Sequence, residues 1–181
     1  MKTFPLLLSL TSIIALPALS DVVLVNDNGF ILANTARANA PQERVYQALI
    51  EDVDNWWPKD HSWWRGTFSI DPVGGGCFCE IKGAHQAQHM DIAFVDPPST
   101  LVMRGGLGPL QQMGVSGALT WSLTEQTDDG GTYTTITLRY HAQGITEGGF
   151  TDFAPIVDKV QALQLNALAE YASNHASATT D

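Results

Sequence analysis

The stretch VSGALTWSLTEQTDDGGTYTTITLRYHAQG, residues 115–144, decides the fold. Large apolar side chains alternate with polar ones on both sides of the Gly130-Gly131 turn. The apolar set is Val115, Leu119, Trp121, Leu123, Ile136, Leu138 and Tyr140. A period of two places such a set on one face of a strand and the polar residues on the other. The stretch therefore predicts two antiparallel strands with one face on the core and one in water.

Further elements extend outward from this hairpin in both directions. Strands are predicted at 22–25, with an extended continuation over 30–38, and at 65–71, 77–82, 86–95 and 100–106. Turn residues such as Asp96-Pro97-Pro98-Ser99 separate them. A first helix begins near Pro41 and ends near Asn55. A second, long helix carries an apolar stripe of Phe153, Ile156, Val157, Val160, Leu163, Ala167 and Tyr171. This order predicts an α+β domain with its helices on one face of the sheet.

Residues 1–20 have the pattern of a cleavable secretory signal peptide. Lys2 provides the positive charge, residues 4–19 form an apolar run, and Ala18 and Ser20 are the small residues that a cleavage site needs. The run of about 16 residues is shorter than the roughly 20 that cross a bilayer, although an uncleaved anchor or a first strand of the domain are the alternatives. We expect cleavage after Ser20, a periplasmic or secreted mature chain, and no stable membrane insertion after cleavage.

Length and charge limit what the mature chain can be. Residues 21–172 have the size of one domain with a sizeable core, and residues 173–181 read as a flexible polar tail. The chain has 9 Lys and Arg against 19 Asp and Glu, a formal net charge of −10. Because such a surface repels phosphate backbones and anionic lipids, no nucleic acid partner is expected.

The two cysteines, Cys77 and Cys79, are separated by a single residue. On a regular strand their Cα atoms would lie about 6.5–7 Å apart, at or beyond the usual limit for a disulfide. Two thiols alone do not complete the tetrahedral shell of a metal. The spacing favours reduced packing thiols. A strained or bulged disulfide in an oxidising compartment, and metal or redox chemistry, are the alternatives.

Several segments together resemble one known superfamily. They are NWWPKDHSWW (55–64), VGGGCFCE (73–80), LVMRGGLGPL (101–110), VSGALTWSL (115–123), LRYHAQG (138–144) and PIVDKVQALQLNALAEY (155–171). Over about residues 22–172 the chain resembles the SRPBCC superfamily of START-like and Bet v 1-like proteins, including bacterial polyketide cyclases and activators of the heat-shock protein 90 ATPase. The resemblance implies a helix-grip fold. In that fold a curved antiparallel sheet of about six or seven strands wraps around a long C-terminal helix, and two short helices follow the first strand. It also implies a cavity between sheet and helix that holds apolar ligands and, in some members, supports catalysis.

The tryptophan-rich segment 55–64 is the strongest functional candidate. Its tryptophans are Trp56, Trp57, Trp63 and Trp64. Each can bury about 150–250 Å², either against a ligand or as a plug between helices and sheet. Given the cavity that the resemblance implies, we expect at least one of them to contact an apolar or aromatic small molecule. Further expected contacts are Trp121, Tyr140, Phe153 and Val157.

Glu80 and Arg104 are the candidates for a polar end of that cavity. Glu80 shares a strand face with Phe78, and Arg104 lies between Met103 and Gly105. If both side chains enter the cavity, they can pair with each other or fix the polar end of a ligand. The alternative is an ordinary cross-strand pair on the outer face.

The histidines do not form a metal site. His61 is an exposed loop residue, with a ligand contact or an acid–base group as the alternative. His85 and His89 would lie about 13 Å apart on one strand and cannot chelate one ion unaided. Strict alternation turns His89 to solvent together with Asp91. The chain has no P-loop, HExxH or dinucleotide-binding pattern, so neither a metal nor a cofactor is expected.

Three functions are compatible with these features. The leading hypothesis is an exported protein that binds an apolar or aromatic small molecule, because aromatic residues gather where no complete catalytic set does. The second is a cyclase, dehydratase or hydrolase in which His61, Glu80 or Arg104 moves a proton or polarises a carbonyl. The third is a protein-interaction domain related to chaperones. A fold alone does not distinguish them.

Overall fold

The structure, a computed structural model, describes residues 19–176. Residues 1–18, which hold most of the expected signal peptide, and residues 177–181 of the expected tail lie outside this range. The strands are β1 (Leu19–Asn26), β2 (Gly29–Ala38), β3 (Thr67–Ile70), β4 (Cys77–Lys82), β5 (His85–Asp96), β6 (Thr100–Gly105), β7 (Ser116–Asp128) and β8 (Gly131–Gln143). The helices are α1 (Gln42–Glu51), α2 (Val53–Trp56), α3 (Pro109–Gln112) and α4 (Ala154–Asn174).

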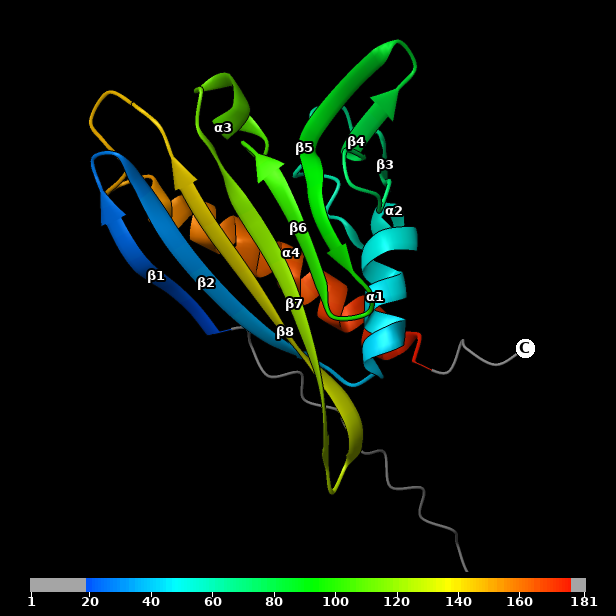
Figure 1. Cartoon of the computed structure of the whole chain (residues 1–181). Coiled ribbons are helices and arrows are strands. Elements are labelled where there is room, and N and C mark those ends of the chain that lie inside the picture. The colour runs from blue at the N-terminus through cyan, green and yellow to red at the C-terminus, as the bar shows by residue number, and fades with distance from the viewer. Residues whose placement is uncertain (1–18, 177–181) are drawn as a thin grey trace, which may run out of the picture.

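The eight strands form one antiparallel sheet in the order β1-β2-β8-β7-β6-β5-β4-β3. The sheet curves, and α4 runs along its inner face while α1 stands at one side (Figure 1). The alternating residues of β7 and β8 point as expected: Leu119, Trp121, Leu138 and Tyr140 are buried. The α+β helix-grip architecture predicted from the sequence is confirmed.

The sheet has eight strands rather than the expected six or seven because the chain reverses at residues 26–29. The sequence indicated one extended segment interrupted there by a turn. Instead, β1 folds back on β2, with Asn26 opposite Gly29 and Val22 opposite Leu32. Each apolar stretch is therefore a strand of its own, and β1 becomes an edge of the sheet.

The face that α4 presents to the sheet differs from the predicted stripe. Leu163 and Ile156 are 56% and 58% exposed, whereas Leu165 and Leu168 are fully buried. The buried face also contains Ala154, Ala169 and Ala172. Small alanines allow the helix axis to approach the sheet closely, so this face packs although it carries less apolar bulk than the predicted one. The helix continues past residue 172, and Ser173 Oγ accepts a hydrogen bond from the backbone N–H of Asn39 (2.8 Å).

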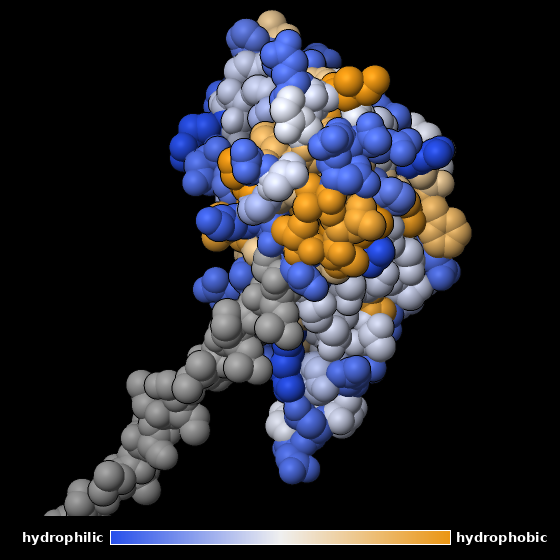
Figure 2. All heavy atoms as spheres, turned by 90° about the vertical axis from the view of Figure 1, so that its left-hand side faces the viewer, coloured by the Kyte–Doolittle hydropathy of each residue, from blue (hydrophilic) through white to orange (hydrophobic). Residues whose placement is uncertain are grey.

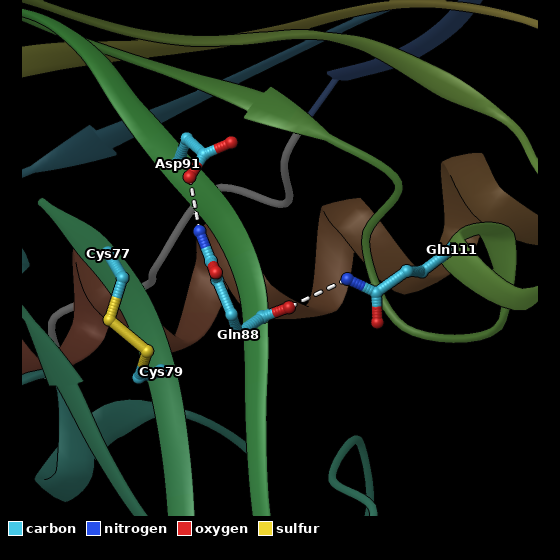
Figure 3. The surroundings of a disulfide bond; sticks show 5 residues. All are labelled: Cys77, Cys79, Gln88, Asp91 and Gln111. Atoms are coloured by element: carbon cyan, nitrogen blue, oxygen red, sulfur yellow. Dashed lines mark hydrogen bonds between the residues drawn. A yellow bond between two sulfur atoms is a disulfide. The ribbon is translucent and has the colours of Figure 1, made fainter. Parts of the chain in front are cut away.

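Cys77 and Cys79 form a disulfide on β4, with their Cα atoms 5.6 Å apart (Figure 3). The favoured expectation of reduced thiols is therefore wrong, and the disulfide alternative holds. The expectation assumed a fully extended strand, but the backbone between the two cysteines is shorter than that. Neighbouring polar groups fix this region, because Gln111 of α3 donates to the carbonyl oxygen of Gln88 on β5 (2.7 Å).

Apolar side chains are also exposed along the β1 edge. Figure 2 views the molecule from the side on which β1 lies and shows a cluster of apolar side chains there. Val23 and Leu24 of β1 are each 48% exposed. Among residues 19–176, no helix combines the length and hydropathy needed to cross a bilayer.

Candidate ligand cavity

A cavity of about 330 Å³ opens between α4, α3 and the loop that follows α2. This volume is in the range of pockets that hold small organic molecules. Its lining residues are Trp57, Asp60, His61, Ser62, Trp63, His89, Leu107, Gly108, Pro109, Leu110, Phe153, Ile156, Val157, Val160, Gln161 and Gln164. Apolar side chains form most of the wall, and a few polar groups interrupt it.

The part of the cavity wall that α4 contributes explains why the predicted apolar stripe of this helix does not all face the sheet. Phe153, Ile156, Val157 and Val160 belong to that stripe and line the cavity, and of these only Val157 is also buried in the core. Ile156 is 58% exposed, which leaves apolar surface at the rim. The two expected contacts Phe153 and Val157 therefore lie where a ligand of this cavity would touch them.

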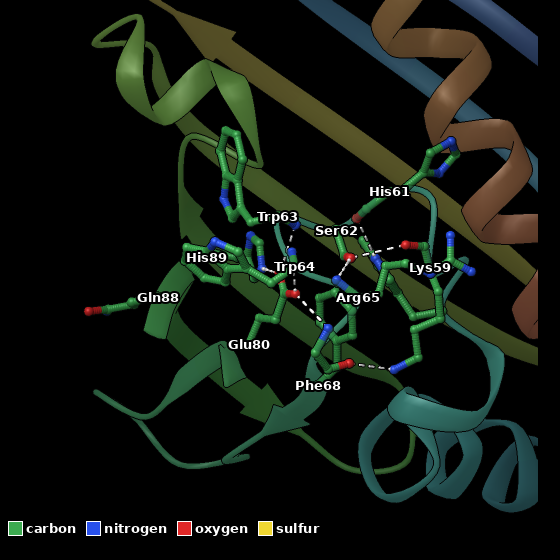
Figure 4. A network of polar contacts seen from close by, with 12 residues as sticks. Lys59, His61, Ser62, Trp63, Trp64, Arg65, Phe68, Glu80, Gln88 and His89 are labelled. Atoms are coloured by element: carbon green, nitrogen blue, oxygen red, sulfur yellow. Dashed lines mark hydrogen bonds and ion pairs between the residues drawn. The ribbon is translucent and has the colours of Figure 1, made fainter. Parts of the chain in front are cut away.

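The opposite wall is the loop of residues 57–66, which Glu80 holds in place. The Glu80 carboxylate is fully buried and accepts backbone N–H bonds from Trp63 (3.0 Å), Trp64 (3.0 Å) and Gly66 (2.8 Å). Figure 4 shows the Glu80 carboxylate next to Trp63 and Trp64 of this loop, with the hydrogen bonds drawn as dashed lines. Glu80 thus positions the tryptophans and does not line the cavity itself.

These contacts determine the charge of Glu80. Burial by itself would raise the pKa of the carboxyl, but the three backbone donors and His89 outweigh it and lower the pKa below its usual 4.5. Glu80 is therefore a carboxylate at neutral pH.

Gly66 is required for this arrangement. A Cβ on Gly66 would lie 2.6 Å from the carbonyl oxygen of Ile81 and 2.9 Å from Cγ of Glu80. Only glycine lets the loop backbone come this close to the carboxylate. Lys59 supports the same turn from the other side by donating to the Gly66 carbonyl oxygen (2.7 Å).

His89 lies on the cavity wall, so the expectation that it faces solvent is wrong. Between β4 and β5 the register shifts: Phe78 pairs with Met90, and Cys79 pairs with Gln88. His89 is the extra residue of this β-bulge. Both His89 and Met90 are buried in consequence, with His89 only 4% exposed. A bulge interrupts the period of two and redirects a side chain, which simple alternation along the sequence does not anticipate.

His89 and Glu80 form a buried pair. The Nε2 atom of His89 lies 3.3 Å from Oε2 of Glu80. The imidazole stacks on Phe68 (5.5 Å between ring centroids) and packs at a tilt against Phe78 (5.2 Å), and both contacts restrict the plane of the ring. Burial lowers the pKa of His89 more than Glu80 raises it. The ring is therefore neutral at pH 7. A proton on Nε2 satisfies the carboxylate and leaves Nδ1 as a proton acceptor.

The remaining expected contacts lie away from the cavity. Trp56 and Trp121 are buried core residues in edge contact with each other (6.1 Å between ring centroids). The hydroxyl of Tyr140 donates to the Gly105 carbonyl oxygen (3.0 Å), and burial raises the pKa of Tyr140 to about 12. None of the three lines the cavity.

Trp64 and Arg104 lie outside it as well. Trp64 stacks on His85 (5.3 Å between ring centroids) and lines a separate hollow between β5 and α3. Arg104 is exposed and stands opposite Asp91 in the β5–β6 register. Glu80 is fully buried, and Arg104 is exposed on β6, with β5 between the two, so they pair neither inside the cavity nor across strands on the outer face.

Two parts of the cavity were missed in the sequence. The segment Leu107–Leu110 at the start of α3 follows the predicted strand 100–106 and was not among the expected contacts, yet it covers one side of the cavity. Gln161 and Gln164 also line it and are almost fully buried. Their signal was present, because both are polar residues one helical turn from Val157 and Val160 on the same helix.

Comparisons with known proteins support the fold. No protein-family model and no curated protein matches the chain in sequence. A protein from Rhizobium leguminosarum aligns with a TM-score of 0.55 and 15% identity, over 87% of this chain and 98% of that one. CalU16 from Micromonospora echinospora aligns at 0.52 and 17%, over 82% and 69%. The Aha1 dimer from Colwellia psychrerythraea aligns at 0.53 and 19%, over 79% and 96%. The chain thus shares the helix-grip fold of these proteins.

Proposed function

We propose that this protein, as an exported member of the SRPBCC superfamily, binds a small apolar or aromatic molecule in the cavity between α4, α3 and the loop of residues 57–63. The observation that carries the proposal is the position of the apolar stripe of α4. Phe153 and Val160, which are only partly buried, line an open cavity, and Val157 of the core reaches it as well. Apolar surface that the fold itself does not bury is stabilised when a ligand covers it.

The proposal is tested with a neutral apolar probe, N-phenyl-1-naphthylamine, whose fluorescence rises when it leaves water. Val160→Phe should fill the cavity and weaken saturable probe binding by about tenfold, which corresponds to about 1.4 kcal/mol. Lys159→Phe is the matched control, because Lys159 is exposed on the same helix and does not line the cavity. Equal binding by the wild type and both variants would place the probe elsewhere and reject the proposal.

Export is the second part of the proposal and rests on the signal-peptide pattern of residues 1–20. The intact mass of the protein from the exporting compartment should correspond to a chain that starts at Asp21. A soluble protein that retains residues 1–20 would contradict export. Since β1 begins at Leu19, cleavage after Ser20 would remove only the first two positions of an edge strand.

An enzyme is the second candidate function, and the His89–Glu80 pair favours it. A neutral imidazole whose Nε2 is held by a carboxylate, at the wall of an apolar cavity, has the arrangement of a general base. Incubating small-molecule extracts of the host cells with the protein tests this by mass spectrometry. Wild type should convert a compound that His89→Gln leaves unchanged, while the exposed-residue variant Arg104→Gln converts it normally. Identical profiles for wild type and His89→Gln would leave binding without chemistry.

A further inference from the structure

Two glutamines of α4 reach the cavity with amide atoms that have no hydrogen-bond partner. Gln161 is 1% exposed and Gln164 is 2% exposed, and both line the cavity. Among the described residues, no group bonds to either amide atom of Gln161 or to Oε1 of Gln164. Nδ1 of His61, another lining residue, is also buried without a partner.

Such atoms are rare in a folded protein, because a buried polar group normally has a partner. Asp158 lies on the same helix and shows the usual situation: it accepts a hydrogen bond from Nδ2 of Asn34 (3.0 Å). Gln161 and Gln164 differ in that they face the cavity. A molecule that displaced water from the cavity without replacing its hydrogen bonds would leave these atoms unpaired.

We infer that the ligand of this cavity is uncharged and carries a hydrogen-bond donor beside an acceptor, as an amide or a lactam does, and that this group pairs with the carboxamide of Gln161. The inference rests on the proposed binding function. The carbonyl oxygen of the ligand accepts from Nε2 of Gln161, and its N–H donates to Oε1. Both atoms of Gln161 lack partners, so the pairing is the same whichever way the carboxamide is turned.

The charges around the cavity exclude an ionised ligand group. The lining contains no lysine or arginine, so a carboxylate or phosphate would lose its hydration without gaining a counter-charge. The net charge of the chain, −10, also disfavours an anion. Asp60 is exposed at the rim, and the carboxylate of Glu80 is already engaged by the loop, so a buried cation finds no free partner either.

Three probes of nearly equal shape separate these chemistries by calorimetry. They are 2-naphthamide, 2-acetonaphthone, which has a methyl group in place of the amide nitrogen, and the anion 2-naphthoate. Wild type should bind the amide about tenfold more tightly than the ketone, the scale of one hydrogen bond, and about a hundredfold more tightly than the anion. Gln161→Met keeps the side-chain length but removes both partners, so it should lower ketone affinity by about tenfold and amide affinity by about a hundredfold, which abolishes the amide preference.

Two further variants complete the design. Gln143→Met is the matched control, because Gln143 is an exposed glutamine on β8 and should leave all three affinities unchanged. Gln164→Met provides an independent test in case Gln161→Met does not fold, and should lower amide affinity by about threefold or more. Circular dichroism shows whether each variant is folded.

The outcomes separate this inference from the proposed function. Loss of the amide preference in Gln161→Met, with the ketone still bound, supports the inference, and if Gln161→Met does not fold, the same loss in Gln164→Met supports it. Equal binding of amide and ketone by wild type overturns the inference but leaves an apolar binding cavity. An amide preference that the folded Gln161→Met retains, or that Gln164→Met retains where Gln161→Met does not fold, has the same consequence. If neither the amide nor the ketone binds to wild type, the proposed function fails and the inference fails with it.

Discussion

Glu80 shows how one buried residue positions a surface loop. The Glu80 carboxylate accepts hydrogen bonds from the backbone N–H groups of Trp63, Trp64 and Gly66, which would otherwise bond to water. These three hydrogen bonds in turn keep the carboxylate ionised. Hydrogen bonds to charged groups are stronger than neutral ones, so a single side chain can fix several backbone groups. The tryptophan wall of the cavity therefore depends on a residue that does not touch the cavity.

Replacing Glu80 tests this role. In Glu80→Gln the amide NH₂ faces backbone donors, so the free energy of unfolding should fall by about 2–4 kcal/mol. Denaturant titration at pH 7 measures it, and the exposed-residue variant Glu51→Gln is the control. An unchanged midpoint in Glu80→Gln would show that the loop is held by other contacts.

The pH dependence of stability should show both members of the buried pair. The pKa of His89 is lowered in the fold, so on acidification the unfolded chain takes up a proton first, beginning near its usual 6.5. The contribution of the neutral His89 to the free energy of unfolding should be fully present above that pH and decline below it. The pKa of Glu80 is also lowered, so a second decline should follow below about pH 4.5. Denaturant midpoints measured from about pH 8 down to about pH 2 cover both declines.

His89→Gln isolates the first of these declines. The variant should lose the part that begins near pH 6.5 and keep the part below about pH 4.5, while the exposed-residue variant His141→Gln keeps both. A first decline that survives in His89→Gln would assign it to another group.

At the scale of elements, α4 carries two apolar faces with different tasks. One packs on the sheet through Leu165, Leu168 and several alanines, and the other lines the cavity through Phe153, Val157 and Val160. An apolar stripe in the sequence shows which side of a helix carries the large apolar side chains. It does not show whether those side chains pack on the sheet or line a cavity beside it.

Leu163 and Leu168 test which face of α4 packs on the sheet. Leu168→Ala removes a fully buried side chain and should cost about 2–4 kcal/mol through lost burial and a cavity. Leu163→Ala removes a side chain that is 56% exposed and should cost less than about 1 kcal/mol. Denaturant midpoints that fell equally in the two variants would contradict the observed rotation of the helix.

The disulfide within β4 closes a very short loop and should stabilise the fold only slightly. Chain-entropy arguments scale with the logarithm of loop length, so joining residues 77 and 79 should contribute no more than about 2 kcal/mol. The double variant Cys77→Ala/Cys79→Ala should therefore fold and unfold at a modestly lower denaturant concentration. Failure of this variant to fold would assign the disulfide a larger role.

At the scale of the whole molecule, the cavity combines segments that are far apart in sequence. Trp63 follows α2, His89 lies on β5, Leu110 belongs to α3, and Gln161 belongs to α4. The sheet curves around α4, and α3 and the segment after α2 lie at the same end of the molecule (Figure 1). Of the four clustered tryptophans, Trp57 and Trp63 line this space, whereas Trp56 belongs to the core.

Trp56 and Trp63 should therefore respond differently to truncation. Trp63→Ala should weaken binding of N-phenyl-1-naphthylamine by about 1–3 kcal/mol with a smaller loss of stability. Trp56→Ala should lower the free energy of unfolding by about 3–5 kcal/mol, because Trp56 is 5% exposed and donates to the Ala48 carbonyl oxygen (2.7 Å). Strong destabilisation by both changes, with no effect on probe binding, would reject the cavity as the binding site.

The sequence by itself determined the fold class, the strands of the central hairpin and the tryptophan segment. Patterns with a period of two, helical stripes and turn residues are local, and the strands 77–82, 116–128 and 131–143 follow from them with small changes of boundary. The resemblance to helix-grip proteins supplied the arrangement of these elements, which the structure confirms.

Only the tertiary structure decided which side chains meet in the cavity. A single extra residue in β5 turned His89 inward, the rotation of α4 exposed Leu163 and placed Gln161 on the wall, and the strand arrangement separated Arg104 from Glu80. The physical reason is that a bulge, a helix rotation and a strand register are chosen by packing across the whole core. Local pattern limits these choices but does not select among them.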